Sequence, residues 1–248
     1  MLTHPTMDKI EQLRLSGMAK AFAEQMRNNE IGSLSFEERL GLLIDRELTE
    51  RENRRLSTRL RTARLRLTAS VEDIDFRQNR GLDKSLVMSL ATNHWVGDRQ
   101  NLLITGPTGV GKSYLACALS HKACRDGHTA LYQRLPRLLH DLTISRDDGR
   151  HRKLMAALLR TDVLILDDFG LVPTTKEGLR DMLEILEDRY DRRSTIVTSQ
   201  LPVASWHESM GDPTMADAIL DRLVHNAHKI ELKGESMRKT RSAVDKPK

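Results

Sequence analysis

A short stretch in the middle of the chain has the residue types and the spacing of a phosphate-binding loop. Residues 106–113 read GPTGVGKS and match the pattern G-x-x-x-x-G-K-[ST]. Its glycines permit backbone conformations that other residues avoid, so that main-chain N–H groups can turn toward a phosphate. An apolar run precedes the loop and a helical pattern follows it. We therefore predict a nucleotide site formed by Gly106, Pro107, Thr108, Gly109, Val110, Gly111, Lys112, Ser113 and Tyr114.

The polar residues of this loop have expected roles. A helix that begins near Lys112 would point the positive end of its dipole at the phosphates. The Lys112 ammonium should contact the β- and γ-phosphates, and the Ser113 hydroxyl should ligate Mg²⁺. The alternative is an ordinary glycine-rich turn before a helix. It is disfavoured because the bare pattern would arise by chance in a chain of this length about once in a hundred sequences.

A pair of carboxylates follows another apolar run. Residues 163–166 read VLIL, and Asp167 and Asp168 come directly after them. A continuously apolar run is typical of a strand buried on both faces of a parallel sheet, and its carboxyl end lies where such sheets bind ligands. We predict that Asp167 serves the Mg²⁺, directly or through a water, and that Asp168 polarises the attacking water. A loop-capping role is the alternative for Asp168.

A third group of polar residues ends the run 194–199, which reads STIVTS and is followed by Gln200. If this strand lies between the first and third strands, a polar group at its end can reach the γ-phosphate or the water. We predict this role for Gln200, with Ser199 as the alternative. The guanine-reading tetrapeptide N-K-x-D is missing from the sequence, which favours adenine, and therefore ATP, as the nucleotide.

Two arginines near the carboxyl end could neutralise charge in a transition state. Arg222 lies in a helical pattern over residues 215–223, and Arg238 follows the last apolar run in the sequence GESMRK. An arginine supplied by a neighbouring subunit can accelerate phosphoryl transfer by several powers of ten. A surface salt bridge is the alternative role for each arginine.

Short apolar runs that alternate with helical patterns must position these residues. The runs occupy 101–105, 129–134, 163–168, 194–199 and, more weakly, 228–232, and helical patterns fill 112–125 and the stretch up to about 160. Runs of about five residues separated by helices indicate parallel strands with crossover helices. The predicted fold class is α/β, with a five-stranded parallel sheet between helices.

The amino-terminal part of the chain reads as helix instead. A helical pattern over residues 13–22 breaks at Gly32, and Ser35 with Glu38 forms a capping box for a second helix. Apolar residues at steps of three and four continue this second helix to Leu67. We predict an all-helical domain and an α/β domain with a short basic tail. Their ranges are 1–75 and 76–248.

Basic residues are concentrated in two places. The chain has 40 Lys+Arg against 35 Asp+Glu, which gives a net charge of +5. The stretch 54–66 holds six arginines and no acid, and basic residues predominate again after Arg222. Such segments on a nearly neutral body favour a polyanionic partner, although a merely solvated arginine-rich helix would look the same. The six arginines are Arg54, Arg55, Arg59, Arg61, Arg64 and Arg66.

Composition excludes several classes of protein. The two Cys are too few for a disulfide framework or a Cys-rich zinc module, and they fit a reducing compartment. The apolar runs are too short to span a bilayer, and the beginning MLTHPTMDK lacks the pattern of a secretory signal. We expect a cytoplasmic protein without a membrane partner.

The motifs together resemble the IstB-type ATP-binding proteins of insertion sequences. The resemblance covers nearly the whole chain and rests on GPTGVGKS, LILDDFGL, TSQLP, DAILDRLVHNAHKIELKGESMRK and the amino-terminal LRLSGMAKAF and LSFEERLGLLIDRE. It implies an AAA+ P-loop ATPase related to the DnaC helicase loaders and, more distantly, to DnaA. It also implies self-assembly on double-stranded DNA in the presence of ATP, deformation of that DNA, and activation of a transposase.

The resemblance also assigns roles to residues outside the loop. Asp168 takes the place of the acidic water activator, Gln200 that of the first sensor and Arg238 that of the second. Arg222 is similar to the finger that such proteins supply to a neighbouring subunit. Many AAA+ proteins have Glu where Asp168 stands, and Gln200 replaces the more usual Asn. Because geometry governs base catalysis before acidity does, slow turnover is expected.

On this basis the arginines of residues 54–66 would bind duplex phosphates without reading sequence, with a steep dependence on salt. The chain has Phe 4, Trp 2 and Tyr 3, too few aromatics for a single-strand stacking platform. A replicative helicase loader is the nearest alternative. Two further alternatives are a small-molecule kinase, for which no inserted lid is visible, and a nucleotide-gated binding module with negligible hydrolysis.

Overall fold

The computed structural model describes residues 5–78 and 80–237. Contacts between residues divide the chain into two compact units, one from Met1 to Thr58 and one from Arg59 onward. The sequence suggested a division after residue 75. The segment 59–75 instead packs with the second unit, where Ala63, Ala69 and Val71 are buried.

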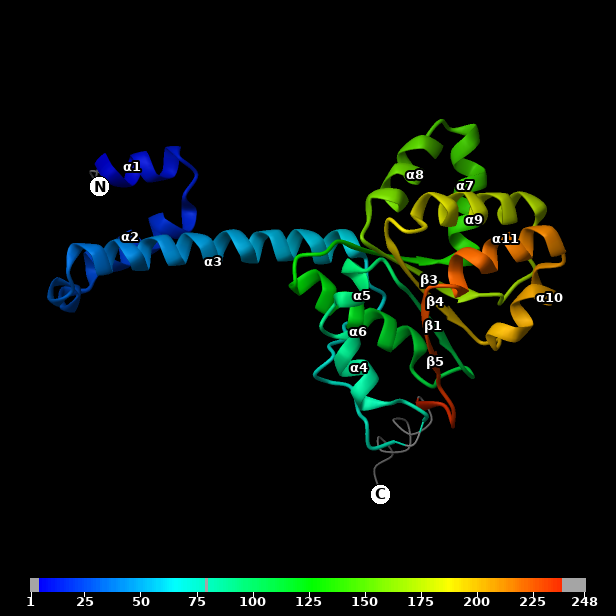
Figure 1. The fold of residues 1–248 in the computed structure, drawn as a ribbon. Coiled ribbons are helices and arrows are strands. Elements are labelled where there is room, and N and C mark those ends of the chain that lie inside the picture. The colour runs from blue at the N-terminus through cyan, green and yellow to red at the C-terminus, as the bar shows by residue number, and fades with distance from the viewer. Residues whose placement is uncertain (1–4, 79, 238–248) are drawn as a thin grey trace, which may run out of the picture. The chain divides into compact units, whose positions relative to one another are not determined.

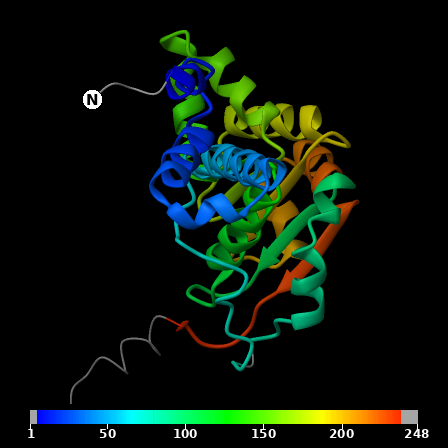
Figure 2. The same cartoon turned by 90° about the vertical axis from the view of Figure 1, so that its left-hand side faces the viewer.

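The second unit contains a five-stranded sheet in which all paired strands are parallel (Figure 1). The strand order is β2-β3-β4-β1-β5, so β5 forms one edge, beside β1 (Figure 2). Each strand matches a predicted run to within one residue at either end, and the predicted fold class is confirmed. The strands are β1 (Asn101–Thr105), β2 (Ala130–Arg134), β3 (Val163–Phe169), β4 (Ser194–Ser199) and β5 (Ala227–Glu231).

Helices cover both faces of this sheet. Helix α6 (Lys112–Arg125) lies on one face, and α7 (Leu135–Asp147), α9 (Lys176–Arg189) and α11 (Pro213–Val224) lie on the other (Figure 1). Strand residues such as Leu103, Leu164 and Val197 pack in one apolar cluster with residues of the second group of helices. The smaller elements are α4 (Lys84–Leu90), α5 (His94–Gly97), α8 (His151–Arg160), η2 (Val203–Ser205) and α10 (Trp206–Met210).

The first unit is helical, as predicted, but its helices differ in extent from the sequence pattern. The elements are α1 (Pro5–Gln12), α2 (Ser16–Arg27), the 3₁₀ turn η1 (Asn29–Ser33) and α3 (Phe36–Ala63). Arg14 adopts a left-handed φ of 57°, which separates α1 from α2 within the predicted helical pattern. The predicted capping box is confirmed, because the Ser35 N–H donates to Glu38 Oε2 at 2.8 Å and the Glu38 N–H donates to Ser35 Oγ at 3.2 Å.

Helix α3 ends earlier than predicted. The apolar spacing suggested a helix to Leu67, whereas the structure ends it at Ala63. Arg64 has a left-handed φ of 48°, a conformation that commonly closes a helix. Arg64 and Arg66 therefore lie beyond the helix that was expected to carry them.

A buried carboxylate joins α2 to α3. Glu47 Oε2 accepts hydrogen bonds from the backbone N–H groups of Gly17 and Met18 at 2.7 and 3.1 Å, so it caps the amino end of α2. Arg51 donates to the other carboxylate oxygen at 2.7 Å. A Cβ atom on Gly17 would lie 2.6 Å from the Arg46 carbonyl oxygen, so the two helix backbones approach closely at this glycine.

Within residues 5–78 and 80–237, none of the helices has the length and apolar character needed to cross a membrane.

We expect Gly17→Ala to lower the free energy of unfolding of the first unit by about 1–3 kcal/mol, because the methyl group must push the backbone of α3 away. Gly41→Ala is the matched control, since a Cβ there would have nothing within 4 Å. It should be neutral or stabilising by about 0.5–1 kcal/mol, because alanine favours helix over glycine. Thermal unfolding followed by circular dichroism measures both variants. Equal effects of the two substitutions would contradict the close approach.

Candidate nucleotide-binding site

The loop between β1 and α6 has the backbone that its glycines predict. Gly106, Gly109 and Gly111 have φ values of 139°, 86° and 100°, which other residues rarely adopt. A Cβ atom on Gly106 would lie 2.1 Å from the carbonyl oxygen of Leu232. Gly111 is the N-cap of α6, so the helix begins at Lys112 as predicted. The loop therefore turns tightly and presents the amino end of a helix.

The Lys112 ammonium lies over this loop. Its Nζ donates to the carbonyl oxygens of Gly106 and Pro107, both at 2.7 Å. The side chain is buried, and this burial lowers the pKa of Lys112, although the nearby Asp167 and Asp168 carboxylates act in the opposite direction. A partly desolvated cation at the amino end of a helix is suited to an anionic ligand.

Asp167 is held by several groups of the site. Its carboxylate is fully buried and receives polar contacts on both oxygens. Ser113 donates to Oδ1 at 2.8 Å, and the Thr198 hydroxyl also donates to Oδ1. The Tyr132 hydroxyl donates to Oδ2, and Arg66 Nη1 lies 3.6 Å from the same oxygen. Burial, and then the hydrogen bond to Asp167, raises the pKa of Tyr132.

A β-bulge turns the two neighbouring aspartates in different directions. Leu166 of β3 pairs with Val197 of β4, but the next register pair joins Phe169 to Ser199. Two residues of β3 therefore face one of β4 between these pairs. Bulges of this kind re-aim side chains near functional sites. Leu166 lies in the apolar cluster on the other face, so strand alternation directs Asp167 toward α6, where it binds Ser113, and the bulge changes the direction of Asp168.

Asp168 accordingly has a different environment from Asp167. Its φ is 65°, a left-handed conformation that aspartate tolerates better than most residues. Arg134, at the end of β2, donates to Asp168 Oδ2 from Nε at 2.9 Å and from Nη2 at 2.8 Å. Asp168, the predicted water activator, therefore forms an ion pair with Arg134 in this structure.

Strand β4 lies between β1 and β3, which is the order required for a polar residue at its end to reach the loop. Gln200 Oε1 accepts a hydrogen bond from the Thr108 hydroxyl at 2.7 Å. The buried Ser199 hydroxyl donates to the Phe169 carbonyl at 2.7 Å and accepts from the Leu201 N–H at 3.1 Å. Of the two predicted alternatives, Gln200 contacts the phosphate-binding loop and Ser199 is engaged elsewhere.

Arg222 lies on α11, away from the loop of its own chain. Its carbonyl accepts from Asn101 Nδ2 at 2.9 Å, and Asn101 begins β1, whereas the loop follows the other end of that strand. The guanidinium pairs with Glu187 at 2.7 Å and with Asp221 at 3.3 Å. The second predicted arginine, Arg238, lies outside the described residues.

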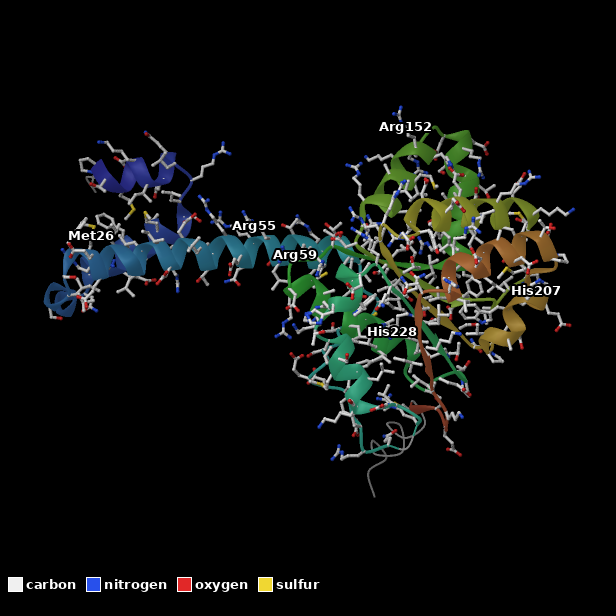
Figure 3. All side chains as sticks on the ribbon, viewed as in Figure 1. Met26, Arg55, Arg59, Arg152, His207 and His228 are labelled. Carbon is white, nitrogen blue, oxygen red and sulfur yellow. The ribbon has the colours of Figure 1, made fainter. Side chains whose placement is uncertain are left out.

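The six arginines expected to contact DNA have unequal environments. Arg54 pairs with Glu50 at 3.6 Å, while Arg59 Nε donates to the Cys124 carbonyl at 2.8 Å. Arg55 and Arg59 both extend from α3 (Figure 3). Because Arg66 contacts Asp167, the run does not form one uniform basic face. The residues on α3 are Arg54, Arg55, Arg59 and Arg61, and those beyond it are Arg64 and Arg66.

Sequence reasoning missed several residues that hold the site together. Tyr132 and Thr198 bind the Asp167 carboxylate, and Arg134 binds that of Asp168. Each lies on a predicted strand near its carboxyl end, so the rule that parallel strands end at one edge could have found them. The sequence singled out Arg66 only as part of the arginine run 54–66, and no pattern points to its contact with Asp167, because its segment adopts neither a helix nor a strand.

Arg80 is a further support of the loop that the sequence did not reveal. Its guanidinium is buried and donates to the carbonyl oxygens of Val110 at 3.2 Å and of Asp75 at 3.1 Å. Burial lowers the pKa of Arg80. A Cβ atom on Gly111 would lie 2.8 Å from Arg80 Nη1, so the loop packs directly on this side chain.

The donor set fits a phosphate with its divalent cation. The loop offers a helix amino end and the Lys112 ammonium to phosphate oxygens. Beside it, the Ser113 hydroxyl and the Asp167 carboxylate lie 2.8 Å apart and are oxygen donors of the type that Mg²⁺ prefers.

Comparison with known proteins agrees with this geometry. The model of the IstB-like ATP-binding proteins matches residues 8–244. The chain belongs to this family. The insertion sequence ATP-binding protein y4pL of Sinorhizobium fredii is 57% identical over 239 residues, which are 96% of this chain and 98% of that protein. The IS21 ATP-binding protein of Pseudomonas aeruginosa is 34% identical over 232 residues, which are 94% of this chain and 86% of that protein.

Solved structures share the fold of this IstB-like protein. DnaI aligns with a TM-score of 0.59 at 23% identity and covers 66% of this chain and 91% of its own. The DnaC helicase loader aligns with a TM-score of 0.57 at 20% identity and covers 66% of this chain and 97% of its own. The predicted α/β fold of the core and the resemblance read from the motifs are both confirmed.

We expect Lys112→Ala to weaken ATP binding by about 10- to 100-fold, because a charge-assisted contact to phosphate contributes about 1.5–3 kcal/mol. Lys122→Ala is the matched control, since Lys122 lies on the same helix but pairs with Asp126. Its removal should leave the affinity unchanged. Titration with a fluorescent ATP analogue measures both variants. Wild-type affinity in Lys112→Ala would place the phosphates elsewhere.

Proposed function

We propose that this IstB-like protein hydrolyses ATP with the help of Mg²⁺, assembles on duplex DNA, and activates the transposase of the same insertion sequence. One observation supports hydrolysis above all others. Two adjacent carboxylates at the end of β3 have separate environments, with Asp167 bound to Ser113 of the phosphate-binding helix and Asp168 turned away by a bulge.

In this proposal each side chain of the site has a defined task. Lys112 and the loop N–H groups bind the β- and γ-phosphates, while Ser113 and Asp167 hold the Mg²⁺. When bound, this ion would supply positive charge to the phosphates. Asp168 accepts the proton of the attacking water once its carboxylate is free of Arg134, and Gln200 orients the γ-phosphate or the water beside Thr108.

Self-assembly is proposed from the position of Arg222. This arginine lies near the amino ends of the strands, and the loop lies beyond their carboxyl ends, so it cannot serve its own site without a large rearrangement. A head-to-tail neighbour would bring it to the next loop. Such heterologous contacts produce rings or helical filaments.

The proposed DNA binding is supported by the charge of the arginine run, and the proposed transposase partner is supported by similarity to insertion sequence proteins. The arginines of residues 54–66 provide phosphate contacts, and relatives that match almost the whole chain are named as insertion sequence proteins. A replicative helicase loader is the second candidate. It is supported by the fold shared with DnaI and DnaC, which covers 66% of this chain in each case.

We expect Asp168→Asn to retain ATP binding within about twofold and to lose turnover by about 100-fold or more, because general-base catalysis contributes roughly that factor. Asp98→Asn, at an exposed position after α5, is the matched control and should hydrolyse normally. Phosphate release and analogue binding are measured together. Normal release by Asp168→Asn would assign the water-activating role to another residue.

The DNA contacts can be tested with arginines whose side chains are exposed on α3. We expect charge reversal at Arg54, Arg55 and Arg61 to weaken binding to every duplex sequence alike, and to reduce the salt slope by about 0.9 per lost phosphate contact. Reversal at Arg152, Lys153 and Arg160 of α8 is the control with the same charge change. Binding is measured by fluorescence anisotropy over a range of salt concentrations. A loss confined to one sequence would indicate base contacts instead.

A further inference from the structure

The carboxylate of Asp167 has two differently occupied sides. Oδ1 accepts from Ser113 on α6 and from Thr198 on β4, and this is the side of the phosphate-binding loop. Oδ2 accepts from the Tyr132 hydroxyl and lies 3.6 Å from Arg66 Nη1. A guanidinium and the loop therefore lie against opposite oxygens of one buried carboxylate.

A fully buried carboxylate requires a positive charge nearby, because burial removes the water that would otherwise solvate it. Within residues 5–78 and 80–237, Arg66 is the only basic side chain that forms an ion pair with Asp167. The Lys112 ammonium is instead bound to the loop carbonyls. Arg66 thus supplies the charge that a divalent cation beside Ser113 would also supply.

Arg66 is much more exposed to solvent than its partner Asp167. The Asp167 side chain is 0% exposed, whereas that of Arg66 is 44% exposed. Arg66 also belongs to the arginine run 54–66 that is proposed to contact DNA phosphates. A phosphate in a duplex cannot enter the buried position of Asp167, so full engagement of this guanidinium by DNA would draw it away from the carboxylate.

We propose that Arg66 is a removable counter-ion of Asp167 that competes with Mg²⁺ and thereby couples DNA binding to nucleotide binding. With Arg66 in place, a second cation gains less from the same carboxylate. When a duplex phosphate attracts Arg66, the carboxylate becomes a stronger partner for Mg²⁺. By reciprocity, loading of the magnesium nucleotide makes Arg66 available to DNA. The Mg²⁺ step of this inference rests on the proposed magnesium site, and the DNA step rests on the proposed DNA binding.

The competing explanation is that Arg66 merely positions Asp167. The two explanations predict opposite signs. Removal of a competitor lowers the Mg²⁺ concentration needed for nucleotide binding, whereas removal of a positioning group raises it. Tyr132→Phe provides the comparison, because it removes a neutral hydrogen bond to the same oxygen without removing charge.

The test uses the full chain with Arg66→Gln, and with Arg152→Gln as the control of equal charge change at an exposed position on α8 (Figure 3). Binding of a fluorescent ATP analogue is titrated against Mg²⁺ without DNA. We expect the Mg²⁺ concentration needed for half-maximal analogue binding to fall by about fivefold or more in Arg66→Gln. A factor of this size is typical of coupling between two sites. Arg152→Gln should behave as wild type, and Tyr132→Phe should need as much Mg²⁺ as wild type or more.

Thermal unfolding gives a second readout that does not depend on activity. In EDTA, Arg66→Gln should unfold at a lower temperature than wild type, because the Asp167 charge then lacks its partner. Magnesium and nucleotide should raise its melting temperature by more than they raise that of wild type. Arg66→Lys keeps the charge and should retain the wild-type Mg²⁺ requirement. An Mg²⁺ requirement in Arg66→Gln equal to or above that of wild type overturns the inference.

A final titration adds duplex DNA. The Mg²⁺ requirement of wild type should fall when duplex is present, and that of Arg66→Gln should stay the same. If duplex binds both proteins and lowers their requirements equally, the coupling through Arg66 is wrong while the proposed DNA binding stands. If duplex binds neither protein, the proposed DNA binding fails, and the DNA-free titration still decides whether Arg66 competes with Mg²⁺.

Discussion

The site depends on keeping one carboxylate charge, that of Asp167, buried at the carboxyl edge of the sheet. Such a charge is stable only if hydrogen-bond donors and a cation surround it. The fold supplies these groups from α6, β2, β4 and the segment after α3. Because every one of these elements must be in place for the carboxylate to be satisfied, the same contacts that stabilise the fold also fix the geometry of the nucleotide site.

The neighbouring Asp168 shows how the backbone separates two identical side chains. An unbroken strand would direct successive side chains to opposite faces of the sheet, where one of them would meet a packed helix. The bulge between the register pairs and the left-handed φ of Asp168 allow both carboxylates to remain at the strand end. One is then buried against α6 and the other forms an ion pair with Arg134 at the end of β2.

At the opposite end of the sheet, a buried arginine binds several backbone carbonyls. Arg189 of α9 is buried, and its guanidinium donates to the carbonyls of Leu158 at 2.6 Å and Thr161 at 2.8 Å. Burial lowers the pKa of Arg189 to about 9. Glu187 on the same helix holds the Arg222 guanidinium. An arginine fixed on this end, and a phosphate-binding loop on the other, give the head-to-tail assembly proposed here a physical basis.

The sequence by itself determined the sheet, the loop and the acidic pair, because these features depend on local patterns. Apolar runs predicted the strands to within a residue, and the glycine spacing predicted the turn before Lys112. The apolar spacing did not reveal the break at Arg14, whose left-handed φ interrupts the first helical pattern while its N–H donates locally to the Glu11 carbonyl. Only the tertiary structure placed Tyr132 and Arg66 at Asp167, because residues far apart in the chain are brought together by packing, and no local spacing records which buried charge an arginine will neutralise.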